Sequence, residues 1–447
     1  MAVDVYEGQD AAGGMARTIS LWGQKVDLGS HRFFSSDPRV NSIWLEVVGT
    51  NYDMITRLSR IYYNKRFFHY PLQAWNALFG LGIFKSIHCV ISYILARIHP
   101  LKDESSFQNW VTNRFGKKLF NIFFKSYSEK LWGISCTELD ADFAAQRIKK
   151  FSLSAAIKSA FIKPNKGAHM TLVDQFAYPH QGAGIVYEEM AKRVSELGGT
   201  MHYQTLVKSV IRNGNTITGI TLENGEQKNY DHVISTMPLS LLVKQLGAPE
   251  EVTKAASSLQ FRNTILVYLE IEGDNPFPDQ WIYIHSPELK TGRVSNFRNW
   301  VPQLYGDAKT TILCLEYWCY DNDTIWSENE DALVQLASTE IMQTGLIKSG
   351  KILRGKMIRI PRCYPVYARG YKELMKPIER YLRTLSGLNV IGRYGSFKYN
   401  NQDHSILMGL MVAQNLAEGA SHDLWAINTD YEYQEKAFIT QTGLEKR

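Results

Sequence analysis

The sequence has no run of five or more basic residues, no C-x-x-C pair and no Cys/His cluster with metal-ligand spacing. The 50 Lys and Arg residues outnumber the 44 Asp and Glu residues, a formal charge of only +6 over 447 residues. This spread-out charge argues against a nucleic-acid partner, and the cysteine and histidine spacing argues against a metal site. The five scattered cysteines are most simply interpreted as reduced, which predicts a cytoplasmic setting.

No uninterrupted apolar stretch predicts a transmembrane span. The most apolar stretch covers residues 76–98, but Lys85 and His88 interrupt it and Arg97 lies near its end. A central Lys costs about 2.5–3.5 kcal/mol on membrane-insertion scales, so we expect a buried pair of amphipathic helices here, with peripheral membrane contact left open. Residues 1–7 also lack the basic and then apolar order of a secretion signal.

The composition is that of a globular protein, with 45% hydrophobic and 21% charged residues. A chain of this length predicts about three structural units. No Pro/Ser-rich linker or low-complexity tract separates them. We therefore expect units that interleave, with the chain leaving one sheet and returning to it later.

Hydrophobic periodicity divides the chain into helical and extended regions. Residues 3–6 alternate like a short strand, and residues 37–165 show helical periodicity with many aromatics. The segment 201–238 has period two, and its Asn213-Gly214 and Asn224-Gly225 pairs predict hairpin turns in a small antiparallel ribbon. The other predicted elements are a buried strand at 231–236, a β-rich stretch at 262–320, a strand at 388–393 and a helix at 407–418.

The first chemical motif lies at the end of the first predicted strand. Glu7 there could accept hydrogen bonds from the ribose hydroxyls of a dinucleotide, although a strand-terminal Glu is usually a surface residue. Gly13 and Gly14 would let the backbone approach a ligand closely, and Arg17 and Thr18 supply a cation and a hydroxyl. A simple glycine turn is the alternative.

Three further blocks carry candidate residues. Arg147 follows an aromatic helical block, and Arg293 stands on a strand before a Ser-Asn-aromatic turn; each could be an ordinary surface arginine. Two guanidinium groups could instead chelate a diphosphate with paired hydrogen bonds that Lys would not reproduce. The third block, residues 392–405, reads GRYGSFKYNNQDHS and has a purely structural loop as its alternative.

In order along residues 3–418, these blocks resemble the UDP-galactopyranose mutase type of flavoprotein, within the superfamily of amine and protoporphyrinogen oxidases. The resemblance implies an α/β fold: a Rossmann-like FAD-binding domain without its first βα unit, an inserted helical domain and an antiparallel β-sheet substrate domain. It expects a further strand and G-x-G-x-x-G turn, about 30 residues, before Glu7. The implied division is residues 1–36, 169–250 and 386–420 for the FAD-binding domain, 37–168 for the helical domain, 251–385 for the β-sheet domain and 421–447 for a tail.

The same resemblance assigns roles to individual residues. Arg147, Arg293 and His31 would be catalytic, although a lone histidine is usually structural. Substrate would contact the two arginines together with Tyr364, Tyr399 and Asn296. The residues implied for FAD are Glu7, Gly13, Gly14, Arg17, Thr18, Gly29, His31, Val207, Gly392, Arg393, Asn401, Gln402, Asp403 and Ser405.

The implied activity is ring isomerisation of UDP-galactopyranose to UDP-galactofuranose, through an adduct between the sugar and N5 of reduced FAD. NAD(P)H would serve only to reduce the flavin, the substrate would be a nucleotide sugar of the UDP-hexose type, and the pathway would be polysaccharide assembly. Two alternatives stay open. One is an FAD-dependent oxidoreductase of the protoporphyrinogen or amine oxidase type, and the other is an inactive relative that lacks the first βα unit. The sequence gives no oligomeric state.

Overall fold

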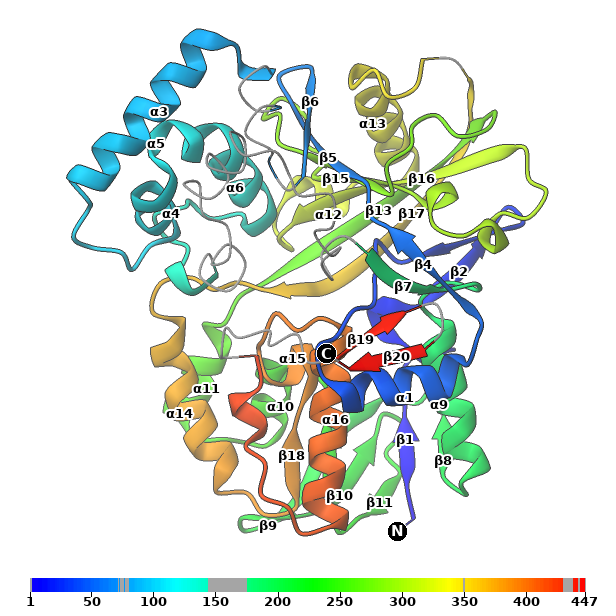
Figure 1. Cartoon of the computed structure of the whole chain (residues 1–447). Coiled ribbons are helices and arrows are strands. Elements are labelled where there is room, and N and C mark those ends of the chain that lie inside the picture. The colour runs from blue at the N-terminus through cyan, green and yellow to red at the C-terminus, as the bar shows by residue number, and fades with distance from the viewer. Residues whose placement is uncertain are drawn as a thin grey trace.

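The computed structural model describes residues 2–70, 72, 76, 80–143, 175–348, 350–428, 437–440 and 443–446. Arg147 lies outside the described residues. One half of the molecule carries a large sheet and helices α3 to α6, and in the other half the N-terminal and C-terminal segments come together (Figure 1). The chain passes between these halves several times, as the absence of linkers predicts.

The large sheet has seven strands in the order β17-β13-β16-β15-β14-β5-β6. All neighbours pair antiparallel except β14 and β5, which are parallel. Both faces of its centre are covered, one of them by α13 (Glu330–Gln343). The strands are β5 (Ser59–Tyr63), β6 (Arg66–His69), β13 (Phe261–Glu272), β14 (Trp281–Ile284), β15 (Arg293–Asn296), β16 (Thr310–Cys319) and β17 (Ile352–Pro365). The predicted β-rich stretch at 262–320 is confirmed.

The prediction of continuous helical periodicity from residue 37 is wrong for residues 52–69. They form β4 (Tyr52–Thr56), β5 and β6, and β4 pairs with β7 (Gln175–Pro179). The hairpin between β5 and β6 turns on Asn64 and Lys65, which both have positive φ, 50° and 60°. A two-residue turn of this kind normally carries glycine, and Lys in its place hides the signal.

The other half contains two pairs of parallel strands. β1 (Asp4–Tyr6) pairs with β8 (Thr200–His202), and β12 (Val233–Ser235) pairs with β18 (Leu388–Val390). Parallel strands with helices packed beside them make this half an α/β structure. Residues 231–236 are not the fully buried strand that we expected, because Ile234 is 45% exposed. Among the described residues β12 pairs only with β18, so its other edge has no strand partner there.

The predicted ribbon is confirmed as a three-stranded antiparallel sheet. Helices α1, α9 and α16 surround the parallel strands (Figure 1). The remaining bounds are β2 (Thr18–Leu21), β3 (Gln24–Asp27), β9 (Val207–Asn213), β10 (Thr216–Leu222), β11 (Gln227–Asn229), β19 (Ala437–Thr440), β20 (Gly443–Lys446), α1 (Pro38–Val48), α9 (Ile185–Glu196), α10 (Leu239–Gln245), α11 (Glu250–Ser257), α12 (Thr324–Ser327), α14 (Tyr371–Arg383), α15 (Gly392–Gly395) and α16 (Gln402–Ala417).

The helical segment comprises α3 (Ile83–Ile98), α4 (Phe107–Phe115), α5 (Lys117–Leu119) and α6 (Ser126–Trp132), with one π-helical turn before α6. Its aromatic residues form much of the core here, as expected. The expected burial is wrong for α3, because this helix exposes its large apolar side chains; residues 77–79 of the same stretch lie outside the described residues. Among the described residues, no helix combines the length and the apolarity needed to cross a bilayer.

Helix α6 is fixed to the end of β14 by side chains. The Lys130 ammonium donates hydrogen bonds to the carbonyls of Ile284 (2.9 Å), Ser286 (3.2 Å) and Thr291 (2.9 Å). One turn earlier, the Tyr127 ring stacks on His285 with centroids 4.7 Å apart. The helical segment is thereby held against the strand that neighbours β15.

Acid should loosen this junction through His285, which is buried. Burial and the charge of Lys130 lower the pKa of its imidazole from 6.5 to about 3. The unfolded chain therefore binds more protons below pH 6.5, so the contribution to stability is complete above that pH and is lost as the pH falls toward 3. His285→Phe keeps the stacking but cannot titrate, and we expect it to flatten the fall of the unfolding free energy by up to about 1.4 kcal/mol per pH unit. Urea denaturation at a series of pH values measures this, and an unchanged slope would contradict it.

Candidate functional site

The centre of the site is an ion pair between two neighbouring strands. Arg293 of β15 faces Glu316 of β16. Its Nε and Nη2 donate to the two carboxylate oxygens at 2.7 and 2.8 Å. The Glu316 side chain is 1% exposed and that of Arg293 is 18% exposed. Burial alone would lower the pKa of Arg293, but the adjacent carboxylate holds it above its usual value. The pair therefore fixes a permanently charged guanidinium in one orientation.

A loop after β3 lies directly on this pair. Gly29 has φ +96°, and a Cβ built on it would lie 3.6 Å from Glu316 Oε1 and 3.9 Å from Arg293 Nη2. His31 Nε2 contacts the Leu28 carbonyl at 2.9 Å, a bond in which the ring must donate. Burial, with the charges of Arg293 and Arg393, lowers the pKa of His31 to about 4. Its imidazole is therefore neutral at pH 7.

The C-terminal block contributes a cation enclosed by aromatic rings. Tyr364 and Tyr399 stack with centroids 5.4 Å apart, and the Arg393 guanidinium lies 4.8 Å from the first ring and 4.2 Å from the second. Arg393 also donates to the Cys363 carbonyl at 2.9 Å and to the Asn400 carbonyl at 2.8 Å. These bonds use its guanidinium to connect the end of β17 with the loop before α16.

Further aromatic side chains extend from Tyr364 and Tyr399 toward the helical segment, and together these rings form an aromatic wall. Trp318 contacts Tyr364 edge-on at 6.4 Å and Tyr127 at 5.6 Å, while Trp132 contacts Tyr399 at 5.8 Å. Burial, followed by the neighbouring Tyr283, raises the pKa of Tyr127, so its hydroxyl stays protonated. The structure thus brings Arg293, His31, Gly29, Tyr364, Tyr399 and Arg393 into one cluster. Their roles toward a cofactor or substrate stay predictions.

Sequence reasoning missed two members of the cluster. Glu316 is the acidic residue of the strand Thr310–Cys319, which after its first two threonines is otherwise apolar or aromatic. A charge in such a buried stretch is a signal for a paired partner. The sequence pattern places Tyr127 only in the aromatic core of its block. Its hydroxyl is instead close enough to Arg293 and Glu316 for their charges to affect its pKa.

The residues predicted near the adenosine end lie together but bond mostly with the protein. The Glu7 carbonyl accepts from Thr205 N at 2.9 Å, which brings the end of β1 beside Val207 at the start of β9. Gly13 and Gly14 both have positive φ, 109° and 53°. Arg17 forms an ion pair with Asp10 at 2.8 Å.

Thr18 is the predicted ligand residue whose hydroxyl is most fully used by the protein itself. It donates to Asp27 Oδ1 at 2.6 Å and accepts from Gly184 N at 2.8 Å. Burial raises the pKa of Asp27 to about 7 despite this bond and a second one from the Tyr178 hydroxyl. These contacts join β2, β3 and the start of α9, which is a structural role.

The predicted turn at residues 401–405 forms the N-terminus of α16. Asn401 and His404 make a reciprocal capping box there, and Ser405 N bonds the Asn401 carbonyl at 3.3 Å. Gln402 Nε2 donates to the Arg32 carbonyl at 3.3 Å, so this helix N-terminus lies beside the loop that carries His31. Asp403 is buried in the first turn. A helix N-terminus favours an electron-rich group in front of it.

Two predicted substrate residues are not part of the described cluster. Asn296 is buried, and its Nδ2 donates to Asn275 Oδ1 at 2.9 Å and to the Phe277 carbonyl at 3.0 Å. It lies an odd number of residues from Arg293 along β15 and so points to the opposite face of the sheet. Its amide holds a loop. Arg147 lies outside the described residues.

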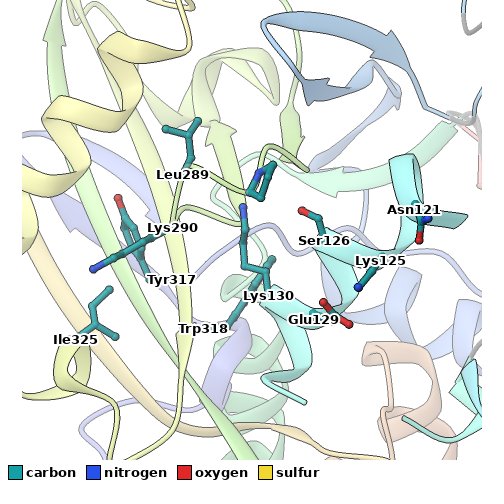
Figure 2. Close-up of a pocket in the computed structure, with 11 residues that line it drawn as sticks. Asn121, Lys125, Ser126, Glu129, Lys130, Leu289, Lys290, Tyr317, Trp318 and Ile325 are labelled. Atoms are coloured by element: carbon teal, nitrogen blue, oxygen red, sulfur yellow. The ribbon is translucent and has the colours of Figure 1, made fainter. Parts of the chain in front are cut away.

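A pocket of about 500 Å³ lies beside the aromatic wall, between α6 and β16. Figure 2 shows Ser126 and Glu129 of α6 on one side, Lys290 and Tyr317 on the other, and Lys130 between them. The pocket shares Trp318 with the wall but contains none of the residues predicted from the sequence. Lys130 cannot hold a ligand there without giving up its three carbonyl partners.

The family of this chain is shown by a match to a family profile. The profile of the flavin-containing amine oxidoreductases matches residues 1–341. The chain belongs to this family. The family implies a flavin cofactor, and its members' α/β fold is the one described above.

Solved structures of low sequence identity share the whole fold. A reduced UDP-galactopyranose mutase superposes with a TM-score of 0.83 at 19% identity, covering 95% of this chain and 90% of that one. A protein of Exiguobacterium sp. 255-15 assigned as a protoporphyrinogen oxidase has a TM-score of 0.65 at 14% identity, with 88% of each chain covered. A redesigned putrescine oxidase has a TM-score of 0.59 at 13% identity, with 93% of each covered. At these identities the likeness shows the fold alone.

Removing one partner of the central ion pair should be costly, because the other charge is then left buried. We expect Glu316→Ala to lower the unfolding free energy by about 3–5 kcal/mol. The double variant Glu316→Ala with Arg293→Met should recover part of this loss, because it buries no unpaired charge. Urea denaturation of the wild type, the two single variants and the double variant measures the coupling. Additive losses would contradict the pair.

Proposed function

We propose that the protein is an FAD-dependent nucleotide-sugar mutase that interconverts UDP-galactopyranose and UDP-galactofuranose, with Arg293 binding the diphosphate. The observation that carries this proposal is the fixed guanidinium of Arg293. It lies beside the loop that contains Gly29 and His31 and beside the aromatic wall. The reduced UDP-galactopyranose mutase, which shares this fold over nearly the whole chain, supports it.

The residues around the cluster fit the ring end of a flavin. The positive φ of Gly29 presents bare backbone at the centre of the cluster, and the N-terminus of α16 lies against the next turn of the same loop. We propose that Gly29, His31, Arg393 and Gln402 hold the ring. When bound, the reduced flavin supplies the nucleophile for exchange at the anomeric carbon, and NAD(P)H supplies the reducing electrons.

Arg293 has one nitrogen left for a ligand by the geometry of its ion pair. Nε and Nη2 contact Glu316, and Nη1 is the nitrogen that this pair does not use. A guanidinium held in this way can donate to a diphosphate oxygen without first losing side-chain freedom. As the bond from the sugar to the diphosphate breaks, negative charge grows on that oxygen, and a fixed cation stabilises it. We propose Arg147 as the second guanidinium.

The neutral state of His31 bears on the same step. With a pKa of about 4 it adds no positive charge at pH 7 to a site that already holds Arg293 and Arg393. The neutral imidazole can therefore orient the flavin ring by hydrogen bonding, while the binding of the diphosphate is left to the arginine. Tyr364 and Tyr399 would donate their hydroxyls to the phosphate oxygens.

Oxidation of an amine or a porphyrinogen is the second candidate function, favoured by the family itself and by the two oxidase-related structures. A substrate ammonium needs an open aromatic face. In this protein the cation position over Tyr364 and Tyr399 is already taken by Arg393. The mutase is therefore the better supported of the two.

The direct test is protection by UDP. UDP should raise the melting temperature of the wild type, because a ligand that binds only the folded state stabilises it. Arg293→Lys should weaken UDP binding at least tenfold, because Lys cannot keep Glu316 and reach the diphosphate together. Isothermal titration calorimetry measures the affinity.

The matched control is Arg60→Lys. Arg60 also forms a two-pronged pair on the same sheet, with Asp279 at 2.6–3.1 Å. We expect this variant to bind UDP like the wild type. Equal losses in both variants would mean that Arg293 acts through stability alone. Oxygen consumption with an amine or a porphyrinogen, together with no effect of UDP, would favour the oxidoreductase.

A further inference from the structure

Helix α3 is built with its large apolar side chains pointing away from the protein. Its small residues face inward: Ser86 and Cys89 are buried, and a Cβ on Gly116 would lie 2.6 Å from the backbone nitrogen of Tyr93. Its outward residues include Phe84 at 79% and Ile83 at 71% exposure. Figure 1 shows α3 at the outer edge of the molecule, with α4 and α5 on its inner side. This arrangement is the reverse of that in a helix that covers a core in water.

The outward residues form one continuous strip. At 3.6 residues per turn they fall within an arc of about 140°, opposite the packed side. The strip consists of Ile83, Phe84, Ile87, Val90, Ile91, Ile94, Leu95 and Ile98, all of them exposed. An apolar surface of this extent on a folded protein marks a binding surface rather than scattered exposure.

The charges around the strip are all of one sign. Residues 80–102 include Lys85, Arg97 and Lys102 and contain no Asp or Glu. Lys118 lies close by, because its backbone nitrogen bonds Ser92 Oγ at 3.1 Å. The two acidic residues that follow are paired elsewhere, Glu104 with Arg114 at 3.0 Å and Asp103 with Arg369 at 3.5 Å.

This charge pattern decides between two occupants. In a twofold pair of α3 helices, each copy would add only positive charge, from Lys85 and Arg97, and the helix offers no acid to offset it. An anionic lipid surface instead supplies apolar chains for the strip and negative headgroups for the cations of this segment. We propose that α3 lies in the plane of an anionic membrane surface, with this strip inserted among the acyl chains. The inference is independent of the proposed catalytic function.

The test is flotation of the full chain with vesicles in a density gradient. The wild type should float with vesicles of phosphatidylcholine and phosphatidylglycerol, and less with phosphatidylcholine alone. Ile87→Glu with Ile94→Glu should reduce binding at least tenfold. The matched control is Leu197→Glu with Leu353→Glu, which adds the same two carboxylates at exposed apolar positions outside α3 and should float like the wild type.

A second variant reports on insertion itself. Phe84→Trp adds a tryptophan on the strip to the ten of the wild type, and the difference between the emission of the variant and that of the wild type should shift to the blue when vesicles are added. Circular dichroism checks that each variant is folded. The proposal is overturned if the wild type does not float, if the Ile87→Glu, Ile94→Glu double variant floats like the control, or if the emission of the Phe84→Trp variant does not shift. It is also overturned if the wild type is an oligomer that the Ile87→Glu, Ile94→Glu double variant dissociates, since a second copy would then cover the strip.

Discussion

The two-pronged contact between Arg293 and Glu316 is the constraint on which the site depends. Because both residues stand on neighbouring strands in register, the sheet sets their separation before any ligand is present. The Glu316 carboxylate makes it possible to keep the Arg293 guanidinium mostly buried, away from water. Because Nε and Nη2 contact this carboxylate, Nη1 is directed away from the ion pair. The charge of Arg293 helps to lower the pKa of His31 and partly opposes the rise that burial causes in the pKa of Tyr127.

The helical segment connects this centre with the outside of the molecule. Helix α6 carries Tyr127 to the cluster and is held by Lys130 and Ser126 to the backbone that leaves β14. Helix α3 lies at the far side of the same segment (Figure 1), and its exposed apolar side chains form the strip. The strip on α3 and Tyr127 on α6 belong to the same helical segment. With the strip inserted in a membrane surface, the orientation of this segment on the lipid would also orient the site.

The sequence predicts well those features that depend on local chemistry. The Asn-Gly pairs at 213 and 224 mark the ribbon because few other residues adopt the required backbone. Residues that converge from distant parts of the chain, such as His31, Arg293 and Tyr399, could be grouped only through a family resemblance, since spacing alone does not bring them together. The hairpin at Asn64 and Lys65 was not predicted, because Lys65 stands where a turn with positive φ normally has glycine.

Other differences arise where a tertiary partner decides the role. Thr18 and Asn296 have side chains suited to a ligand, but Asp27 and Asn275 take their hydrogen bonds. Glu316 is an ordinary strand residue by its sequence, and only its neighbour across the sheet reveals its role. The amphipathic pattern of α3 correctly predicts a helix, but periodicity does not tell which face meets the protein. The inward face of α3 carries the small residues Ser86 and Cys89, and Gly116 of the neighbouring helices allows the α3 backbone to approach closely at Tyr93.

The most direct measurement is a crystal structure of the protein with UDP. We expect a diphosphate oxygen within hydrogen-bond distance of Arg293 Nη1, while Nε and Nη2 remain on Glu316. A diphosphate bound away from Arg293, or an Arg293 that leaves Glu316 to reach it, would contradict the account.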